Sequence, residues 1–370
     1  MKKIFLRGYF TKNLGDDLFF YILGNRYRKI KFYAFSPIKY NKKILPSNII
    51  MFSGIIYRCL NKIIRLITKE KNNVNSIIKS KCDFMIYPGG SIFYDDMPLD
   101  LLKRCVDIDY FNPYLKYIIV SSNISKVSTK NDDYNKQIAR IIKNAEYVGV
   151  RDKFSYKIIG KYGKVNYNPD IVFSLSTNNI NIMQDKESKR KILISIINPL
   201  KKHKSKEFYN DYKKFISTMI KDLYSKNYII TLMSFCKFEG DEKIILEIEK
   251  EMKKENIKVL KYYYRGNIKE ALEKIASNDT IIATRFHANI IGMILNKNVI
   301  PIIYGDKTYE LLQDIEFNGK YFDIRHKVPD YYGLIEEDFD YHVNIEKEIE
   351  NSKKHLEKVD QILKKEDIYV

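Results

Sequence analysis

Residues Thr280–Lys307 read TIIATRFHANIIGMILNKNVIPIIYGDK, and this stretch decides the fold. It begins with an apolar run, Thr280–Ala283, that has the length of one buried strand. A segment with helical periodicity follows from Ala288 to about Leu295, and a second apolar strand is expected at Val299–Ile303. A strand, a helix and a strand in succession predict a parallel α/β unit with a right-handed crossover.

Arg285 and His287 lie where the first of these strands ends and the helix begins. Free backbone N–H groups and the helix dipole favour a bound anion at that point, which is also the strand end where ligands bind in open α/β sheets. The alternative is an ordinary ion pair for Arg285 and a capping or buried histidine. Only 12 of the 65 basic residues are arginine and only five residues are histidine. Because arginine binds phosphate or carboxylate in a two-pronged way, the pair favours a site for a phosphorylated substrate.

Length and composition describe a globular chain. With 370 residues, two domains are expected, and 45% hydrophobic with 30% charged residues excludes a disordered protein. The net charge of +19 is compatible with nucleic acid, anionic membranes or acidic substrates. The four cysteines are far apart and show no metal-ligand or redox spacing, which predicts a reduced cytosolic protein without a zinc site. The first ten residues read as a strand and not as a signal peptide, so we expect a soluble or peripheral protein.

The N-terminal half shows the same alternation of strands and helices. Strands are expected at Lys3–Arg7, Asp83–Tyr87, Lys116–Ser121 and Tyr147–Val150. Helices are expected from the end of the 8–17 loop to about Tyr27, at Asp132–Asn144 and at about Lys153–Tyr162. The first strand leads into a loop in which Asp16 or Asp17 is placed to cap the helix. Gly8 and Gly15 fit either close approach by a substrate or a tight strand–helix turn.

Three further segments of this half have two interpretations. Ile49–Ile67 is apolar, with basic residues at helical spacing, and predicts a helix that packs on a sheet or lies on a membrane surface. The Gly89-Gly90-Ser91 loop follows a strand, as phosphate and sugar loops do, although a glycine pair alone is a weak signal. Arg151 follows another strand and either binds an anion or forms an ion pair with Asp152 that closes the turn.

The polar, aperiodic segment 176–190 predicts a linker between an N-terminal domain (1–175) and a C-terminal domain (191–320). Residues 321–370 are expected to form an extension with a mixed-charge helix at Glu346–Lys365. Strands of the second domain are expected at Lys191–Ile197, Tyr228–Ser234, Ile257–Lys261, Thr280–Ala283 and Val299–Ile303. Its helices are expected near Glu207–Lys226, Gly240–Lys254, Lys269–Ser277 and Ala288–Leu295.

With these motifs in order, the chain resembles the polysaccharide pyruvyl transferase family. The matching elements are Asn13-x-Gly15-Asp16-Asp17, Gly89-Gly90, Val150-Arg151-Asp152-x-x-Ser155, Pro169-Asp170, Arg285-x-His287 and Pro301-x-x-Tyr304-x-x-Lys307. They extend across roughly residues 5–315. Two positions depart from the family pattern: Ser91 stands where a third glycine is usual, and Asp17 where glutamate is common.

The resemblance implies an α/β fold of two Rossmann-like domains that face each other across a cleft, as in glycosyltransferases of the B class. It also implies transfer of a pyruvyl group from phosphoenolpyruvate to two hydroxyls of a sugar, with formation of a cyclic ketal and release of phosphate. The family's catalytic arginine and histidine correspond to Arg285 and His287, and Arg151 is a further candidate. The N-terminal domain is then expected to bind the acceptor, and the C-terminal domain the donor.

This chemistry agrees with the residue types. Phosphoenolpyruvate bears a carboxylate and a phosphate, which call for fixed cations; Arg285, Arg151 and Lys307 are the candidates. His287 is the expected acid that protonates the methylene carbon. The remaining candidate substrate-binding residues are Asn13, Asp16, Asp17, Gly89, Gly90, Ser91, Asp170 and Tyr304, with the aspartates binding sugar hydroxyls or acting as base. Neither a cofactor nor a metal is expected, because arginines can supply the positive charge.

The expected partners are phosphoenolpyruvate and a sugar acceptor in cell-surface polysaccharide synthesis, such as a lipid-linked oligosaccharide. A peripheral contact with the inner face of the membrane is expected for this cytoplasmic protein. The closest alternative function is a glycosyltransferase of the same fold that uses a nucleotide sugar. A nucleic-acid-binding module is disfavoured, because no helix-turn-helix, RNP-type or zinc-finger pattern accompanies the positive charge.

Overall fold

The structure is a computed structural model, and it describes residues 3–36, 38–40, 44–69, 74, 81–93, 115–124, 132–178, 180, 190–202, 204–366 and 368. The chain folds into two compact units. Unit 1 contains Met1–Thr11, Asp16–Ser174 and Glu346–Val370. Unit 2 contains Lys12–Gly15 and Leu175–Ile345. Two short segments therefore belong to a different unit from the chain next to them: the 12–15 loop and the C-terminal helix.

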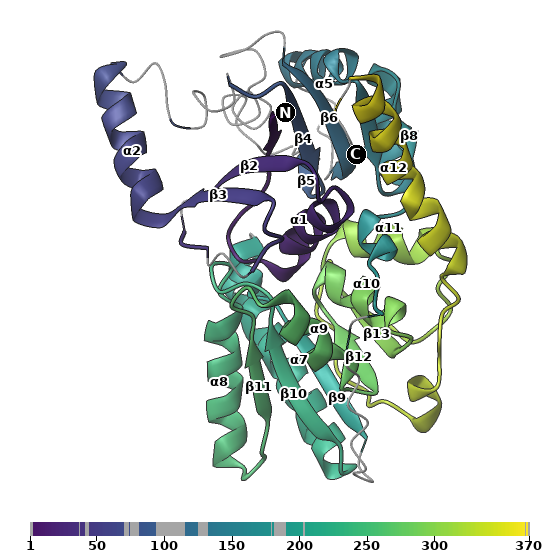
Figure 1. Cartoon of the computed structure of the whole chain (residues 1–370). Helices are drawn as coiled ribbons and strands as arrows, with labels where there is room; N and C mark the ends of the chain where they lie inside the picture. Colours follow the sequence, from purple (N-terminus) through teal and green to yellow (C-terminus); the bar gives the residue numbers. More distant parts are fainter. Residues whose placement is uncertain are drawn as a thin grey trace. The chain divides into compact units, whose positions relative to one another are not determined.

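Unit 1 is built on a parallel sheet (Figure 1). Its strands are β1 (Lys3–Leu6), β2 (Lys31–Ser36), β3 (Ile49–Ser53), β4 (Phe84–Pro88), β5 (Ser91–Phe93), β6 (Lys116–Ile124), β7 (Tyr147–Val150) and β8 (Asn166–Tyr167). They are ordered β3-β2-β1-β4-β6-β7-β8, with β5 beside β6. The central strands β4, β6 and β7 are buried on both faces, as expected where helices cover a parallel sheet, and they are apolar except at the two ends of β6.

The helices of unit 1 within the described residues are α1 (Leu14–Arg26), α2 (Gly54–Ile67), α5 (Asp132–Asn144), α6 (Lys153–Ile159) and α12 (Glu346–Lys365). Helix α12 packs against β6, β7 and the 3-10 turn Ile171–Ser174. Its fully buried His355 contacts the Tyr147 hydroxyl through Nδ1 (2.7 Å) and the Asn168 carbonyl oxygen through Nε2 (3.0 Å). The predicted mixed-charge helix is thus present, and it packs on the sheet of unit 1.

Unit 2 repeats the architecture with a six-stranded parallel sheet in the order β11-β10-β9-β12-β13-β14. Its strands are β9 (Lys191–Ile196), β10 (Ile229–Ser234), β11 (Leu260–Tyr263), β12 (Thr280–Ala283), β13 (Asn298–Ile303) and β14 (Phe322–Asp323). Its helices are α7 (Lys206–Ser225), α8 (Asp241–Lys254), α9 (Ile268–Ala276), α10 (Phe286–Ile294) and α11 (Asp306–Asp314). A continuous apolar core joins α7 and α8 to the sheet.

Both sheets change direction at the same place in their strand order. In unit 2 the chain proceeds outward from β9 through β10 to β11, and then returns to the other side of β9 with β12. In unit 1 the corresponding neighbours are β1 and β4. The carboxyl ends of strands at such a switch point are where open α/β sheets bind ligands. The loops after β1, β4 and β12 are the three that contain Asn13-x-Gly15, Gly89-Gly90 and Arg285-x-His287.

The structure corrects several expected elements. Ile49–Ile67 is not one helix, because Ile49–Ser53 forms β3 and pairs with β2 before Gly54, at φ +70°, turns the chain into α2. Strand β11 lies three residues later than the expected Ile257 start. Strand β2 was missed, as were the short strands β5, β8 and β14. Helix α11 was missed because its sequence mixes apolar and charged residues. Of the predicted linker 176–190, residues 179 and 181–189 lie outside the described residues.

Candidate functional site

The turn that contains Arg285 is fixed by buried hydrogen bonds. Thr284 and Arg285 connect β12 to α10, and Arg285 occupies the N-cap position with an extended backbone. The Arg285 N–H donates to the Ser195 hydroxyl oxygen (3.1 Å), and the Thr284 and Tyr212 hydroxyls are 3.0 Å apart. Because β9 and α7 supply these partners, the position of Arg285 is set by the core of unit 2.

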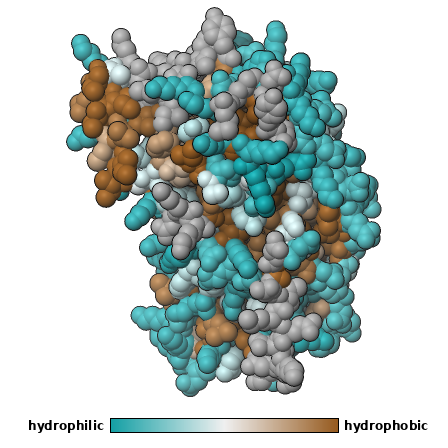
Figure 2. All heavy atoms as spheres, in the orientation of Figure 1, coloured by the Kyte–Doolittle hydropathy of each residue, from teal (hydrophilic) through white to brown (hydrophobic). Residues whose placement is uncertain are grey.

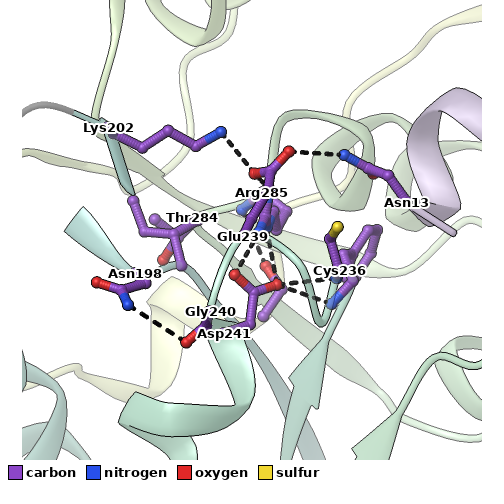
Figure 3. Close-up of polar contacts among 12 residues, drawn as sticks. Asn13, Asn198, Lys202, Cys236, Glu239, Gly240, Asp241, Thr284 and Arg285 are labelled. Atoms are coloured by element: carbon purple, nitrogen blue, oxygen red, sulfur yellow. Dashed lines mark hydrogen bonds and ion pairs between the residues drawn. The ribbon is translucent and has the colours of Figure 1, made fainter. Parts of the chain in front are cut away.

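The Arg285 guanidinium contacts two carboxylates (Figure 3). Its Nε donates to Asp241 Oδ2 (3.1 Å), Nη2 donates to Asp241 Oδ1, and Nη1 donates to Glu239 Oε2. The residue is only 5% exposed, so these charge-assisted bonds offset a large desolvation cost. Burial alone would lower the pKa of Arg285, but the two carboxylates raise it well above its ordinary value. The ion-pair interpretation of this arginine is therefore realised in the structure.

The two carboxylates are themselves held by neighbours. Asp241, the first residue of α8, accepts the backbone N–H groups of Phe235 and Cys236 at 3.0 Å each. Glu239 accepts Lys202 Nζ at 2.5 Å and Asn13 Nδ2 at 3.1 Å. Burial alone would raise the pKa of Glu239, but Arg285 and Lys202 lower it well below its usual range. Glu239 is thus ionised and joins two cations to the Asn13 loop.

The Asn13 loop lies against the first turn of α10. Asn13 pairs with Cys236 in an antiparallel bridge, and its Oδ1 accepts the Gly15 N–H at 3.1 Å. A β-carbon on Gly15 would lie 2.0 Å from Nδ1 of His287, so only glycine fits at this position. The half-buried His287 ring also makes an edge contact with the Phe286 ring, at 5.0 Å between centroids. Two motifs separated by most of the chain therefore meet in unit 2.

Tyr304 and Lys307 follow β13, the strand beside β12. The Lys307 ammonium lies 5.5 Å from the ring centroids of both Phe286 and Tyr304. Tyr304 is buried, which alone would raise the pKa of its phenol, but Lys307, Lys202 and Arg285 lower that pKa below its ordinary value. Three cations thus act on one phenol, and a fixed positive field of this kind stabilises an anion or a developing negative charge.

We refer to Lys202, Glu239, Asp241, Arg285, His287, Tyr304 and Lys307 as the unit 2 cluster. Its three cations exceed its two carboxylates by one charge, and its imidazole is held at a helix N-terminus. Such a group of side chains can bind an anion and exchange a proton with it. Of the predicted site residues, this cluster and its Asn13 loop bring together Asn13, Arg285, His287, Tyr304 and Lys307.

A second polar group lies at the carboxyl ends of the unit 1 strands. Arg151 donates through Nη1 to Asp170 Oδ2 (2.8 Å) and through Nη2 to Asn123 Oδ1 (2.7 Å). The Ser91 hydroxyl also donates to Asn123 Oδ1, at 3.2 Å. Asp152, the expected alternative partner of Arg151, caps α6 by accepting the Ser155 N–H. The structure therefore joins Ser91, Arg151 and Asp170 through Asn123.

The glycine pair next to this group has left-handed backbone angles, with φ +60° at Gly89 and +78° at Gly90. A β-carbon on Gly89 would lie 2.0 Å from the Phe19 ring, whereas one on Gly90 would meet none of the described residues within 4 Å. The Gly90 carbonyl oxygen accepts the N–H groups of Ile92 and Asn123. Gly89 thus serves packing against α1, and Gly90 leaves open space at the loop.

The structure places Asp16 and Asp17 in the first turn of α1 rather than at its N-cap. Asn13 precedes the helix, and its side chain accepts a backbone N–H of the first turn, so the expected capping by either aspartate is wrong. Asp17 is fully buried and accepts the Tyr40 hydroxyl at 2.8 Å. Asp16 is half-buried.

Sequence reasoning missed four residues of these groups: Lys202, Glu239, Asp241 and Asn123. A signal existed for two of them. Glu239-Gly240-Asp241 follows a strand and opens a helix, with Gly240 at φ +79°, and such an acidic pair predicts a partner for a buried arginine. Lys202 lies in a short turn after β9, and Asn123 lies near the end of β6, both in stretches without a distinctive pattern. Only the fold identifies them.

Neither a metal-binding group nor a membrane-spanning helix is found in the part of the chain that the structure describes. No group of three or more His, Cys, Asp or Glu side chains in the described ranges is arranged to hold a metal ion. Among the helices described, none has the length and apolarity that crossing a bilayer requires.

Two parallel α/β sheets of Rossmann strand order, each in its own unit, define the chain as a GT-B-like protein. The family model for polysaccharide pyruvyl transferases matches residues 13–306. The chain therefore belongs to the polysaccharide pyruvyl transferase family, which supports polysaccharide pyruvylation as its general activity. The matched segment begins at Asn13 and includes both polar groups described above except Lys307, which follows its last residue. No curated protein sequence matches the chain.

Three solved structures show the same fold. The UDP-GlcNAc 2-epimerase of Methanocaldococcus jannaschii, in complex with UDP-GlcNAc and UDP, has a TM-score of 0.60 at 13% identity, over 98% of this chain and 99% of that chain. The UDP-GlcNAc 2-epimerase of Neisseria meningitidis has a TM-score of 0.59 at 11% identity, over 98% and 100%. HepE of Anabaena, in complex with UDP and glucose, has a TM-score of 0.52 at 12% identity, over 100% of both chains. At these identities the likeness concerns the fold alone.

Proposed function

We propose that the protein transfers the pyruvyl group of phosphoenolpyruvate to two hydroxyls of one sugar, forming a cyclic ketal and releasing phosphate. Family membership supports pyruvyl transfer. The observation that supports this chemistry in the chain is the close approach of Gly15 to His287, whose imidazole lies in the first turn of α10, two residues after Arg285 of the unit 2 cluster. A proton donor next to an anion site is what the donor substrate requires.

The proposed reaction balances without an oxidant or a reductant. A proton adds to the methylene carbon of phosphoenolpyruvate, which becomes a methyl group and leaves C2 electron-poor. One sugar hydroxyl forms a bond to C2, the C2–O bond to phosphate breaks, and the second hydroxyl forms the other ketal bond. The two sugar hydroxyls release two protons. One balances the proton added to the methylene carbon, and the other leaves with phosphate.

In this proposal His287 is the acid, because its imidazole is held at the first turn of α10. The cations Lys202, Arg285 and Lys307 attract the carboxylate and phosphate of the donor. These three positive charges exceed the two negative charges of Glu239 and Asp241 by one. Arg285 donates three N–H groups to those carboxylates, so part of its role in the site is to hold Glu239 and Asp241 in place. The phenol of Tyr304 binds substrate within the same field.

For the acceptor we propose the residues of unit 1. The Arg151–Asp170 pair, Ser91 and the open Gly90 position present donors and acceptors of the kind that bind sugar hydroxyls. Asp16 and Asp17 are further candidates, although Asp17 already accepts a bond from Tyr40. We propose a cytoplasmic enzyme with a lipid-linked acceptor, used in cell-surface polysaccharide synthesis. Phosphoenolpyruvate is a substrate in this scheme, and the scheme itself calls for no cofactor or nucleic acid.

The test is a reaction in deuterated water with phosphoenolpyruvate and a panel of sugar acceptors. We expect phosphate release that depends on the acceptor, and a product whose new methyl group contains one deuterium from the solvent. Release of free pyruvate alone, or an enol ether that retains the methylene group, would contradict ketal formation.

The same panel tests the alternative, a glycosyltransferase that uses a nucleotide sugar. The similar epimerases and HepE were solved with UDP, which is a property of those proteins. Thermal shift with UDP and with phosphoenolpyruvate separates the two functions. Stabilisation by UDP together with sugar transfer from a nucleotide sugar, and no consumption of phosphoenolpyruvate, would replace our proposal.

A further inference from the structure

Helix α2 of unit 1 presents an exposed apolar surface. Six of the sixteen exposed large hydrophobic side chains in the described residues lie on this one helix of 14 residues. They are Ile55 (72% exposed), Ile56 (68%), Leu60 (39%), Ile63 (50%), Leu66 (69%) and Ile67 (77%). Figure 2 shows them as a brown patch on the face displayed there. Patches of this kind mark interaction sites, since soluble proteins rarely leave them uncovered.

The opposite edge of α2 attaches the helix to unit 1. Tyr57 and Ile64 are half-buried and pack against the apolar core of the sheet, and the Asn61 side chain accepts the Val74 N–H at 3.2 Å. These residues recur at helical spacing, so they form one narrow edge. The helix is therefore folded onto unit 1, and its apolar side chains are exposed although the helix is docked.

Basic residues form a second stripe along α2. Arg58, Lys62 and Arg65 are all exposed, and they recur at the same helical spacing as Ile56, Leu60 and Ile63, offset by two residues. No aspartate or glutamate occurs anywhere in Gly54–Ile67. Two residues correspond to about 200° around a helix, so this basic stripe lies on the far side of α2 from Ile56, Leu60 and Ile63. A helix with an exposed apolar face and only basic charges matches a surface of acyl chains and anionic headgroups.

The charge also decides against a second copy of this chain as the occupant. Two copies joined through α2 would bring together two helices that both carry only basic charges, in a protein whose net charge is already +19. With 14 residues, α2 is also too short to cross the hydrocarbon core of a bilayer. A helix with these properties lies along a membrane surface.

We propose that α2 docks unit 1 on anionic membranes, with the stripe of Ile56, Leu60, Ile63 and Ile67 among the acyl chains and the stripe of Arg58, Lys62 and Arg65 at the headgroups. This surface does not depend on the reaction proposed above, because it consists only of exposed side chains of one helix. It would bring the enzyme to the place where a lipid-linked acceptor is found.

The test is co-sedimentation of the full chain with vesicles of phosphatidylcholine, alone or mixed with phosphatidylglycerol. We expect binding to the anionic vesicles that weakens from low to physiological salt. Ile56→Ser, Leu60→Ser and Ile63→Ser combined should weaken it at least tenfold. Arg58→Glu, Lys62→Glu and Arg65→Glu combined should abolish the preference for anionic lipid. Equal binding to both vesicle types, or no binding to either, would overturn the proposal.

Two matched controls separate the effects of the α2 substitutions from those of a change in total charge or in exposed apolar surface. Lys214→Glu, Lys254→Glu and Lys258→Glu combined reverse three exposed charges of unit 2, and so change the net charge by the same amount. Leu246→Ser with Ile335→Ser removes exposed apolar side chains elsewhere. Both controls should bind as the original chain does. If the charge control loses binding equally, total charge and not α2 is responsible, and the proposal fails.

The exposed Cys59 of α2 is a site at which a fluorophore can measure contact of the helix with lipid. Cys82 and Cys236 are buried, and a Cys105→Ser background removes the remaining thiol. An environment-sensitive fluorophore on Cys59 should shift to the blue with anionic vesicles, whereas one on Leu246→Cys in a Cys59→Ser background should not. Sedimentation velocity tests whether a second copy of this chain binds the surface instead. If the protein is a dimer in solution and the substitutions of Ile56, Leu60 and Ile63 dissociate it, the surface is a dimer interface and the membrane proposal is overturned.

Discussion

Gly15 and His287 lie so close that a β-carbon on residue 15 would be 2.0 Å from the imidazole Nδ1. The contact joins a loop that follows the first strand of the chain to the first turn of α10, and Asn13 secures it by binding both Gly15 and Glu239. The Arg285 guanidinium binds the same Glu239. The orientation of the imidazole thus depends on a continuous set of contacts from Arg285 to Gly15.

Gly15→Ala is expected to displace the imidazole of His287 and to lower turnover by about 10²-fold, the low end of the effect of a lost general acid. The contact is with a ring that is held in place, so a shift of the loop or of the ring is required. Steady-state kinetics and circular dichroism measure the two effects. Gly160→Ala, at a helical glycine where the added carbon meets none of the described residues within 4 Å, is the matched control and should behave as the original chain. Equal activity of both variants would exclude a constraint from Gly15.

His287→Gln is expected to lower kcat by roughly 10²–10⁴-fold, with a smaller effect on substrate binding. The limb of the pH profile that belongs to the imidazole should disappear. His326→Gln changes an exposed histidine of the same unit and serves as the control. Combination with Gly15→Ala should give little additional loss, because both changes remove the same function. A pH profile that stays unchanged in His287→Gln would move the acid role to another residue.

Arg285→Lys is expected to lose most activity while the protein stays folded. Lysine keeps the charge but cannot bind Asp241 through two N–H groups and Glu239 through a third. The imperfectly satisfied buried carboxylates should cost about 1–3 kcal/mol of unfolding free energy, measured by urea denaturation. Arg265→Lys is a matched control, because Arg265 also binds one carboxylate, that of Glu242, through two nitrogens but is half exposed. Its stability should change by less than about 1 kcal/mol. Near-normal turnover in Arg285→Lys would contradict its place in the site.

Unit 1 is expected to lose stability as the pH falls from about 6.5 to about 4, because burial lowers the pKa of His355 from 6.5 to about 4. In that interval the unfolded chain binds a proton at His355 and the folded chain does not, so acid favours unfolding. The full difference corresponds to about 3 kcal/mol. Acid and urea titration, followed by hydrogen exchange of α12, measures it. His355→Gln should flatten the dependence in this interval, and an equally steep dependence in the variant would assign it to other groups.

The sequence alone determined the fold class and the family. Segments with the apolar spacing of strands alternate with segments that have the spacing of helices along both halves of the chain. Parallel strands need helical crossovers, so this alternation predicts two Rossmann-like sheets. The same local rules placed Arg285 and His287 at the junction of β12 and α10, where the structure has them. The predicted family was confirmed by the match to residues 13–306. The strand Ile49–Ser53 was missed, because its apolar residues continue into those of α2 without a break in composition.

The partners of these residues were decided only by the tertiary structure. The acidic pair Glu239 and Asp241 indicates a partner for some buried arginine, but the sequence does not say which one. The loop after β10 reaches Arg285 through the parallel order of β10, β9 and β12. The glycine at position 15 reads locally as a turn residue, and its contact with His287 arises from packing across 272 positions of the chain. The spacing of apolar residues in the sequence indicates whether a segment is a helix or a strand and which of its faces is buried. Which side chains pair depends on which loops the strand order of the sheet brings together.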